Sequence, residues 1–332
     1  MKHSEQVILS LACMLFSTYT TYMIADDLNN NICHIEIAEQ GDEMVSLVDT
    51  DSFGNISSDR SVAITGPITI TQSGSYYLDN DVTGKITISA TRVMLDLKGH
   101  TVASTSDSGI EISSASCVVI KNGFIASGSY YSHHGCVRCV ASSNVMCSEL
   151  MCIPSLSANG FVVSDSSDII LTKCKISAQG PSNLSGISLE KVYKVTIDHC
   201  DIHGFYNGIY FSPVPSSSHV SIQHNHIFNS GFYGIQMRAS TGSVVRYNLI
   251  KNNVKGIWIV SGSTKTLVFG NVIKDCTGTA SSEPALYDQG TLSKIYGNIA
   301  QDNVGGYNYS ASIPLQIAEM SVGAGIYANI NW

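Results

Sequence analysis

Charged side chains are scarce in this sequence. Lysine, arginine, aspartate and glutamate make up 13% of its 332 residues, about half of the usual share of roughly 25%. The formal net charge is −8, and no stretch of the chain is rich in basic residues. Nucleic-acid-binding proteins carry a basic stripe or patch. We therefore expect no nucleic-acid partner, and the overall field gives acidic polymers no long-range attraction either.

Long apolar runs are missing as well. The apolar stretch Val7–Phe16 follows Lys2 and His3 and is too short and interrupted to cross a membrane. A basic start, a short apolar stretch and a small residue such as Ala25 are typical of an export signal. We predict a signal peptide over residues 1–25 and a secreted, periplasmic or cell-surface protein. A structural or anchoring segment is the alternative.

The sequence instead contains a repeated phrase of about 25 residues. Each repeat starts with a glycine and two alternating apolar residues, at 109–112, 160–163, 186–189, 208–211, 234–237 and 256–259. A second apolar alternation then ends in Cys or Asn. These positions are Cys147, Cys174, Cys200, Asn225, Asn248, Asn271 and Asn298, at intervals of 27, 26, 25, 23, 23 and 27 residues. Repeats of this length are typical of stacked units that bury their apolar faces against each other.

The alternation within each repeat indicates strands and not helices. A repeat of this length holds two or three short strands, and each turn of the chain then stacks on the next at about 4.8 Å. One side chain of each pair points inward and builds a long apolar core. The Cys/Asn column is expected to point inward too, with Asn amides hydrogen-bonded along the stack.

Over roughly Ile64–Ala300 the chain resembles the right-handed parallel β-helix, or pectin-lyase-like, superfamily. Its opening stretches Gly74–Leu78 and Val93–Val102 match the first coils of many such proteins. The resemblance implies an all-β fold, a single-stranded right-handed parallel β-helix with end caps. This fold carries lyases, hydrolases, epimerases, adhesins and phage fibres, so it implies no particular activity.

The repeat also predicts the domain organisation. Residues 26–60 lack the repeat and are predicted to be an N-terminal cap or linker, with a short amphipathic helix at 42–48. The β-helix is predicted over 61–304 and a C-terminal cap over 305–332. Caps are expected because a solenoid otherwise ends in open strand edges.

Cysteine is abundant, with 10 residues. Cys174 and Cys200 are expected one coil apart, within the Cα separation that a disulfide tolerates, and stacked free thiols are equally compatible with this spacing. Cys136 and Cys139 with His133 and His134 have the composition of a zinc site. Residues three apart in a strand face opposite sides, so only one of the two cysteines is expected to lie inside. We predict no metal site there.

The densest group of titratable residues lies on adjacent coils. His199, His224 and Tyr247 precede the Cys/Asn column and are expected to stack, and Asp201 and His226 form a second outward pair. If the protein is an enzyme, the predicted catalytic residues are Asp198, Asp201, His199, His224 and Arg246. The predicted substrate-binding residues are His203, His226, Arg238 and Tyr247.

The motifs for catalysis are incomplete. The hydrolases of the resembled superfamily share paired aspartates, a Gly-His-Gly and an Arg-x-Lys, and this chain has neither of the last two motifs. Its lyases use calcium-binding acids with a nearby Arg or Lys, for which only Asp198, Asp201 and the two arginines are available. Calcium is expected only for a lyase, and no other cofactor. The favoured hypothesis is polysaccharide binding along one face. The alternatives are a polysaccharide lyase, hydrolase or epimerase, and a structural fibre or adhesin.

Overall fold

In the computed structural model the chain forms two compact units, residues 1–58 and 59–332. The structure describes side chains for residues 61–128, 133–155, 157–180, 184–213, 216–278 and 285–303. It describes the backbone of the strands at 21–24, 35–38, 45–46, 307–309, 318–321 and 326–330. The first unit holds an antiparallel sheet of β1 (Thr21–Ile24), β2 (Ile35–Ala38) and β3 (Val45–Ser46).

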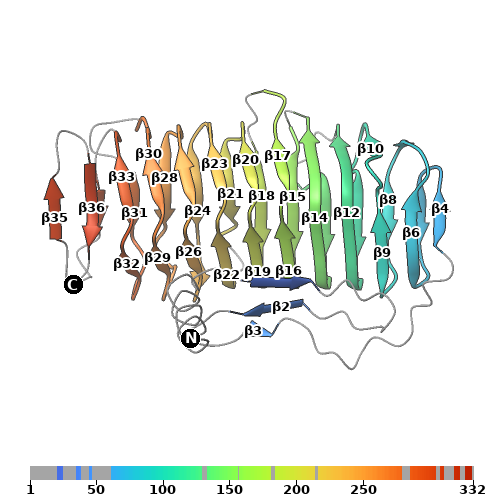
Figure 1. Cartoon of the computed structure of the whole chain (residues 1–332), viewed down its shortest axis with the longest axis horizontal. Coiled ribbons are helices and arrows are strands. Elements are labelled where there is room, and N and C mark those ends of the chain that lie inside the picture. Colours follow the sequence, from blue (N-terminus) through green and yellow to red (C-terminus); the bar gives the residue numbers. More distant parts are fainter. Residues whose placement is uncertain are drawn as a thin grey trace, which may run out of the picture. The chain divides into compact units, whose positions relative to one another are not determined.

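The second unit is a right-handed parallel β-helix, as the sequence predicts, and its coils have three faces. Figure 1 shows its coils side by side along the long axis of this unit. Two faces, A and B, belong to one 22-stranded sheet that bends at a corner, and face C is a separate 11-stranded sheet. Strands of successive coils pair in parallel through all three faces, so each coil is hydrogen-bonded to the next.

The strands of each face follow one another along the stack. Face A contains β4 (Val62–Ile64), β6 (Gly74–Leu78), β9 (Val93–Asp96), β16 (Ser167–Thr172), β19 (Tyr193–Asp198), β22 (Ser217–Gln223), β25 (Ser240–Thr241), β26 (Val244–Arg246), β29 (Leu267–Phe269) and β32 (Lys294–Tyr296). Face B contains β7 (Val82–Thr83), β10 (Thr101–Ser104), β17 (Lys175–Ser177), β20 (Asp201–His203), β23 (His226–Phe228), β27 (Leu249–Lys251), β30 (Val272–Lys274) and β33 (Ile299–Gln301). Two long strands, β12 (Ser116–Ser127) and β14 (Ser143–Pro154), run through the corner from face A to face B.

Face C contains the strands at the six repeated glycines and the strands that continue the same stack at both ends. They are β5 (Ile68–Ile70), β8 (Ile86–Ile88), β11 (Ile110–Ser113), β13 (Gly135–Val140), β15 (Asn159–Ser164), β18 (Ser185–Glu190), β21 (Asn207–Phe211), β24 (Tyr233–Met237), β28 (Lys255–Ile259), β31 (Leu286–Asp288) and β34 (Tyr307–Tyr309). After them β36 (Ile326–Ile330) pairs antiparallel with β33, and β35 (Ala318–Ser321) pairs with β36. The cap at 305–332 stays a prediction.

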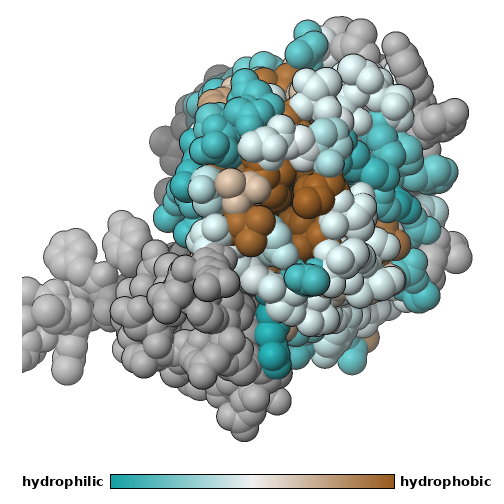
Figure 2. Space-filling view, turned by 90° about the vertical axis from the view of Figure 1, so that its right-hand side faces the viewer, coloured by the Kyte–Doolittle hydropathy of each residue, from teal (hydrophilic) through white to brown (hydrophobic). Residues whose placement is uncertain are grey.

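The register confirms the inward positions that the repeat predicts. Ile187, Ile209, Ile235 and Ile257 lie directly above one another in face C and are at most 1% exposed. The buried residues form one continuous apolar cluster that runs through the coil. Seen from the end that begins with β4, apolar side chains gather at the centre of the coil and hydrophilic ones around it (Figure 2). The alternation in the sequence therefore sorts side chains into core and surface.

The repeated glycines are required by close packing. A Cβ atom at Gly234 would lie 2.7 Å from Cγ2 of Ile250 and 2.8 Å from the carbonyl oxygen of Gly256. Both separations are shorter than any normal carbon contact, and one of the two atoms belongs to backbone. Gly234 thus lets the wall of the coil close against the isoleucine of the next coil.

A ladder of asparagine side chains joins face A to face B. The corner residues His199, His224 and Tyr247 have positive φ angles of 49°, 53° and 53°, so the chain turns sharply there. The next N–H group then points along the stack and finds the side chain of the following coil. The Asn225 N–H donates to Oδ1 of Asn248 at 2.9 Å, and the Asn248 N–H donates to Oδ1 of Asn271 at 3.0 Å.

The prediction of the inward Cys/Asn column is wrong for one residue, Cys147. Cys147 pairs in register with Leu171, whereas Leu150 follows the corner residue Glu149 and takes the place one coil before Cys174. The cause is that β14 continues through the corner as one strand. The position of a cysteine in the sequence therefore does not show whether that cysteine lies at the corner or before it on face A. Cys174 and Cys200 onward hold the column as predicted, and both are buried.

The cysteines of the described part of the chain are all free thiols, Cys174 and Cys200 included. They are Cys117, Cys136, Cys139, Cys147, Cys152, Cys174, Cys200 and Cys276. Cys136 and Cys139 are both buried, which corrects the prediction that only one lies inside. Cys139 points inward from β13, and Cys136 lies at the start of that strand beside the buried Cys152 thiol. Burial raises the pKa of Cys139 to about 11 and that of Cys276 to about 12.

Two further expectations concern the chain's first residues. The helix predicted at 42–48 is wrong at Val45–Ser46, which form β3 by pairing with β2. The predicted signal peptide lies outside the described residues except for β1. In the part of the chain that the structure describes, no helix is long and apolar enough to cross a membrane.

Gly234→Ala should lower the free energy of unfolding by about 2 kcal/mol, because the added methyl group overpacks the wall of the coil. Urea unfolding followed by circular dichroism measures the change. Gly66→Ala is the matched control, since nothing lies within 4 Å of a Cβ at that position. Equal midpoints for the two variants would contradict the role assigned to the glycine column.

Asn248→Ala should cost roughly 3 kcal/mol, because it removes the acceptor for both the backbone N–H and the side-chain amide of Asn225. Thermal unfolding of the purified variant measures this loss. Asn80→Ala, at an exposed amide, should change stability by less than about 0.5 kcal/mol. An Asn248→Ala protein as stable as the native chain would mean that the asparagine ladder does not contribute to the stability of the fold.

Candidate functional site

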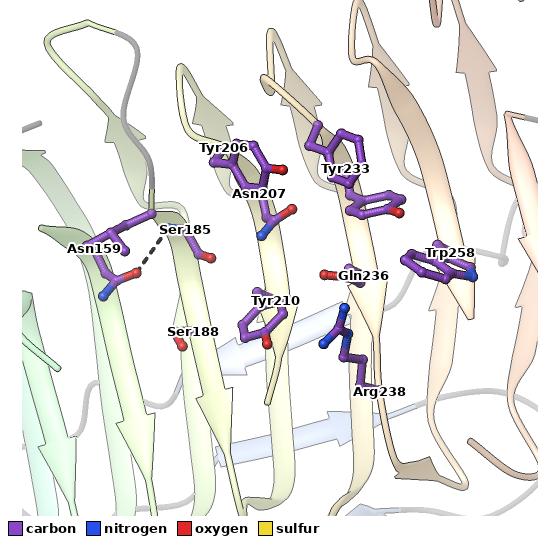
Figure 3. Close-up of a pocket in the computed structure, with 12 residues that line it drawn as sticks. Asn159, Ser185, Ser188, Tyr206, Asn207, Tyr210, Tyr233, Gln236, Arg238 and Trp258 are labelled. Carbon is purple, nitrogen blue, oxygen red and sulfur yellow. Dashed lines mark hydrogen bonds between the residues drawn. The ribbon is translucent and has the colours of Figure 1, made fainter. Parts of the chain in front are cut away.

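A pocket of about 380 Å³ opens on the outer surface of face C, across β15, β18, β21, β24 and β28. Figure 3 shows its side chains projecting from these neighbouring strands. The residues that line it are Asn159, Leu184, Ser185, Ser188, Tyr206, Asn207, Tyr210, Phe232, Tyr233, Gln236, Arg238 and Trp258. We call this site the face C pocket. The described residues of its lining are mostly polar or aromatic, and none of them is a carboxylate, histidine or cysteine.

The repeat determines where these residues lie on the outer surface of face C. The residue two places after each repeated glycine points outward, and Ser188, Tyr210, Gln236 and Trp258 pair in register at this position. Strand pairing spaces them at about 4.8 Å per coil. A second column, one place before each glycine, brings Asn207 next to Tyr233. The floor of the pocket is therefore built from two columns of one repeat.

Several polar groups in the pocket lack a hydrogen-bond partner. Oδ1 of Asn207, Nε2 of Gln236 and Nε of Arg238 are buried, and none has a partner among the described residues. Asn207 is 7% exposed and Gln236 3%. A buried polar atom without a partner costs about 1–3 kcal/mol. Ligand hydroxyl or carboxylate groups in the pocket would satisfy an acceptor and two donors that the fold leaves unpaired.

Aromatic rings form one side of the pocket. The ring centroids of Tyr233 and Trp258 lie 4.9 Å apart. Phe232 packs edge-on against Tyr233, with 4.3 Å between the two ring centroids. Tyr206 stacks on Phe232 at 5.2 Å and remains 41% exposed. Such a wall offers apolar ring faces together with hydroxyl and indole donors at the edges. This combination suits flat, hydroxyl-bearing rings.

The pocket is locally positive on a chain of negative net charge. The Arg238 guanidinium lies 5.8 Å from the Tyr210 ring centre and 6.0 Å from that of Trp258. In Figure 3 it turns toward Gln236. Beside the pocket, Nζ of Lys255 lies 4.6 Å from the Phe232 ring centre. Because none of the lining residues that the structure describes is a carboxylate, the field of these two cations favours an anionic ligand.

The structure brings together three of the predicted catalytic residues at the corner between faces A and B. Nδ1 of His199 lies 2.6 Å from Oδ2 of Asp198, and Nδ1 of His224 lies 3.0 Å from Oδ1. The two imidazoles stack at 4.9 Å, and Tyr247 stacks on His224 at 5.6 Å. The predicted stack of these three rings is confirmed. We call Asp198, His199 and His224 the corner cluster.

Arg246 lies two coils from Asp198 in the same outward column of face A. Its Nε and Nη2 donate to Oε1 of Gln223 at 2.9 and 2.7 Å. Gln223 therefore separates the guanidinium group from the corner cluster along the column, and Arg246 contacts the amide of its neighbour.

Asp201, His203 and His226 lie on face B, beyond the corner. Nδ1 of His226 is 3.6 Å from Oδ1 of Asp201, so the predicted outward pair is confirmed. His203 and His226 both stack on Phe228. Burial lowers the pKa of both imidazoles, partly opposed by the charge of Asp201. Asp198 and Asp201 thus have different histidine partners and do not form one carboxylate pair.

Arg238 is the one predicted residue that lines the face C pocket. Reasoning from the sequence grouped it with the histidines of neighbouring coils and missed Asn207, Tyr210, Gln236 and Trp258. A signal for them was present, since three of the four occupy the same outward position in the phrases Gly-Ile-Tyr-Phe, Gly-Ile-Gln-Met and Gly-Ile-Trp-Ile. The face on which each column lies was not readable from the repeat.

Comparison with known proteins agrees with this architecture. Residues 151–303 match the family model described as a right-handed β-helix region. A point mutant of the periplasmic alginate epimerase AlgG has a TM-score of 0.54 and 14% identity, covering 71% of this chain and 62% of the epimerase chain. This chain thus spans less than two thirds of the epimerase. A comparison with curated proteins gives no match.

Two further solved structures have lower similarity to this chain. An alginate lyase from Paenibacillus sp. str. FPU-7 has a TM-score of 0.47 and 12% identity, covering 75% of this chain and 99% of the lyase. PfbA, a surface adhesin of Streptococcus pneumoniae, has a TM-score of 0.40 and 10% identity, covering 81% of this chain and 85% of the adhesin. At sequence identities this low, similarity to these proteins does not indicate the activity of this chain.

Stability should fall on mild acidification because of His203 and His226. Burial lowers their folded pKa below the ordinary 6.5, so below that pH the unfolded chain binds more protons than the folded one. The loss begins as pH falls through 6.5 and is complete below the lowered folded values. Urea unfolding at about pH 7.5 and about pH 5.5 measures it.

The double variant His203→Gln/His226→Gln should lose less stability between these two pH values than the native chain. His219→Gln, at an exposed position, is the control and should keep the native pH dependence. An unchanged pH dependence in the double variant would show that other groups cause the acid sensitivity.

Proposed function

We propose that this right-handed parallel β-helix protein is exported and binds a polysaccharide in the face C pocket. The observation that carries the proposal is the set of unpaired buried atoms there, on Asn207, Gln236 and Arg238. Burying these atoms without a hydrogen-bond partner is unfavourable in free energy, and hydrogen bonds from a hydroxyl-rich ligand would offset that penalty. The signal-like segment at residues 1–25 supports export.

The aromatic wall supports a sugar ligand. Tyr206, Phe232, Tyr233 and Trp258 present ring faces next to the unpaired donors and acceptor. A pyranose ring has apolar C–H faces and polar edges, and it can pack its face on these rings while its hydroxyls reach the amides. A ligand that was apolar throughout would leave the three polar atoms unsatisfied.

The charge of the pocket favours a polysaccharide that contains uronic acids. Arg238 lines the pocket, Lys255 lies beside it, and the described part of the lining lacks a carboxylate that would repel an anion. A guanidinium group binds carboxylates with paired, charge-assisted hydrogen bonds. The alginate epimerase that shares this fold acts on such a polymer, alginate.

Binding without turnover is the function that the pocket supports best. A glycosidase needs two carboxyl groups, and the described residues that line the pocket have none. Among these residues the tyrosine hydroxyls are the groups that could accept or donate a proton. The described lining therefore has groups that recognise a sugar and lacks the carboxyl pair of a glycosidase.

A second candidate is catalysis at the corner cluster. The 2.6 Å contact between His199 and Asp198 has the geometry of a general base held by a carboxylate. This candidate predicts turnover of the polymer, visible as new reducing ends or as changed sugar stereochemistry. The turnover would be lost in His199→Ala and kept in Trp258→Ala at saturating polymer.

Titration calorimetry with alginate oligomers tests the proposed binding. Trp258→Ala and Arg238→Ala should each weaken it by about tenfold, equal to roughly 1.4 kcal/mol. Neutral dextran oligomers should bind more weakly than alginate to the native chain, and this preference should disappear in Arg238→Ala.

Tyr247→Ala is the matched control, because Tyr247 is a 51% exposed aromatic residue at the corner and away from the pocket lining. It should bind alginate like the native chain. If Tyr247→Ala weakens binding and Trp258→Ala does not, the ligand lies along the corner. If neither polymer binds the native chain, the proposal fails.

A further inference from the structure

The corner cluster holds a buried carboxylate in an outward position. Ile197 fills the core, so Asp198, the next residue of β19, points away from it. Its side chain is nevertheless only 1% exposed. Thr172 and Gln223 flank it in the same column on the two neighbouring coils. A carboxylate in such a place requires strong partners, because burial of an unpaired charge is costly.

Two imidazole nitrogens reach this carboxylate, one from its own coil and one from the next. His199 and His224 occupy the same corner position with the same left-handed backbone, so their rings stack and both Nδ1 atoms face Asp198. Each carboxylate oxygen has its own histidine. The histidine side chains are 50% and 29% exposed, so the cluster is open to solvent on the side of the rings.

We propose that Asp198, His199 and His224 form a binding site for a divalent transition-metal ion of the zinc type. One donor atom from each residue lies within 4.8 Å of the others. Two imidazoles and one carboxylate are a donor set that zinc accepts, with bonds of about 2.0–2.2 Å and water completing the shell. Imidazole donors favour zinc, copper or nickel over calcium and magnesium, which take oxygen ligands.

A metal ion at Nδ1 is bound by the neutral imidazole that carries its proton on Nε2. A proton that joins Nδ1 of His199 or His224 to Asp198 therefore moves by way of solvent to Nε2 of the same ring, and the ion takes its place between the same atoms. Little rearrangement is needed, because the backbone turn and the ring stack already hold the donors together. This site lies outside the face C pocket, and the proposal goes beyond polysaccharide binding and does not depend on it.

The neighbouring histidine–aspartate pair on face B offers a built-in comparison. Asp201 and His226 are 3.6 Å apart, and the Asp201 side chain is 44% exposed. The described residues form only one group of three potential metal ligands, the corner cluster. Variants of Asp201 and His226 therefore remove the same residue types from a pair that lacks a third potential metal ligand, so they serve as controls.

Calorimetric titration of the full-length chain with zinc chloride tests the site, with cobalt(II) absorption as a second readout. The native chain should bind one Zn²⁺ at this site, and Asp198→Asn, His199→Ala and His224→Ala should each weaken that binding by at least about 100-fold. Asp201→Asn and His226→Ala should bind like the native chain. Cobalt(II) should give visible ligand-field bands that the three corner variants lack.

Zinc should also raise the melting temperature of the native chain and leave that of the corner variants unchanged, because only the folded site binds the ion. If Asp198→Asn fails to fold, His199→Ala decides, since half of that side chain is exposed. Absence of saturable zinc binding in the native chain would overturn the proposal. Equal zinc affinity in the native chain and in folded His199→Ala and His224→Ala variants would overturn it too.

Discussion

The structure depends on one constraint, that every coil must stack on the next at the spacing of paired strands. Strands satisfy their own backbone groups, but a corner turns N–H groups out of the ladder. In this chain the side chains of Asn225, Asn248, Asn271 and Asn298 accept those hydrogen bonds, one coil to the next. The glycine column obeys the same constraint, because a Cβ atom at Gly234 would lie 2.8 Å from the backbone of the next coil.

Stacking also creates the surfaces on which function is proposed. A repeat places equivalent positions in columns, so neighbouring coils present a row of side chains at fixed spacing. On face C this row contains Tyr210, Gln236 and Trp258. At the corner it contains His199, His224 and Tyr247. A change of one residue in one repeat alters one step of a row and leaves the coil intact, which allows chemistry to vary on a constant scaffold.

The two sites differ in their chemistry for a physical reason. The face C pocket combines cations, amides and aromatic rings, with no carboxylate among its described lining residues, which suits recognition of an anionic sugar polymer. The corner cluster has a carboxylate buried under two imidazoles, which suits a metal ion or proton transfer. Asp201 and His226, although close in sequence to the corner, lie on the next face and make a looser pair.

The sequence by itself determined the strands, the repeat, the inward isoleucines, the asparagine column and the stacked rings of His199, His224 and Tyr247. These follow from alternation and period, which are local properties of the chain. Only the tertiary structure decided which column faces which surface. It placed Arg238 in a pocket with Trp258, and it placed Leu150 where Cys147 was expected. The reason is that a one-residue difference in the length of a turn moves a side chain to another face, and alternation alone does not reveal where the chain turns.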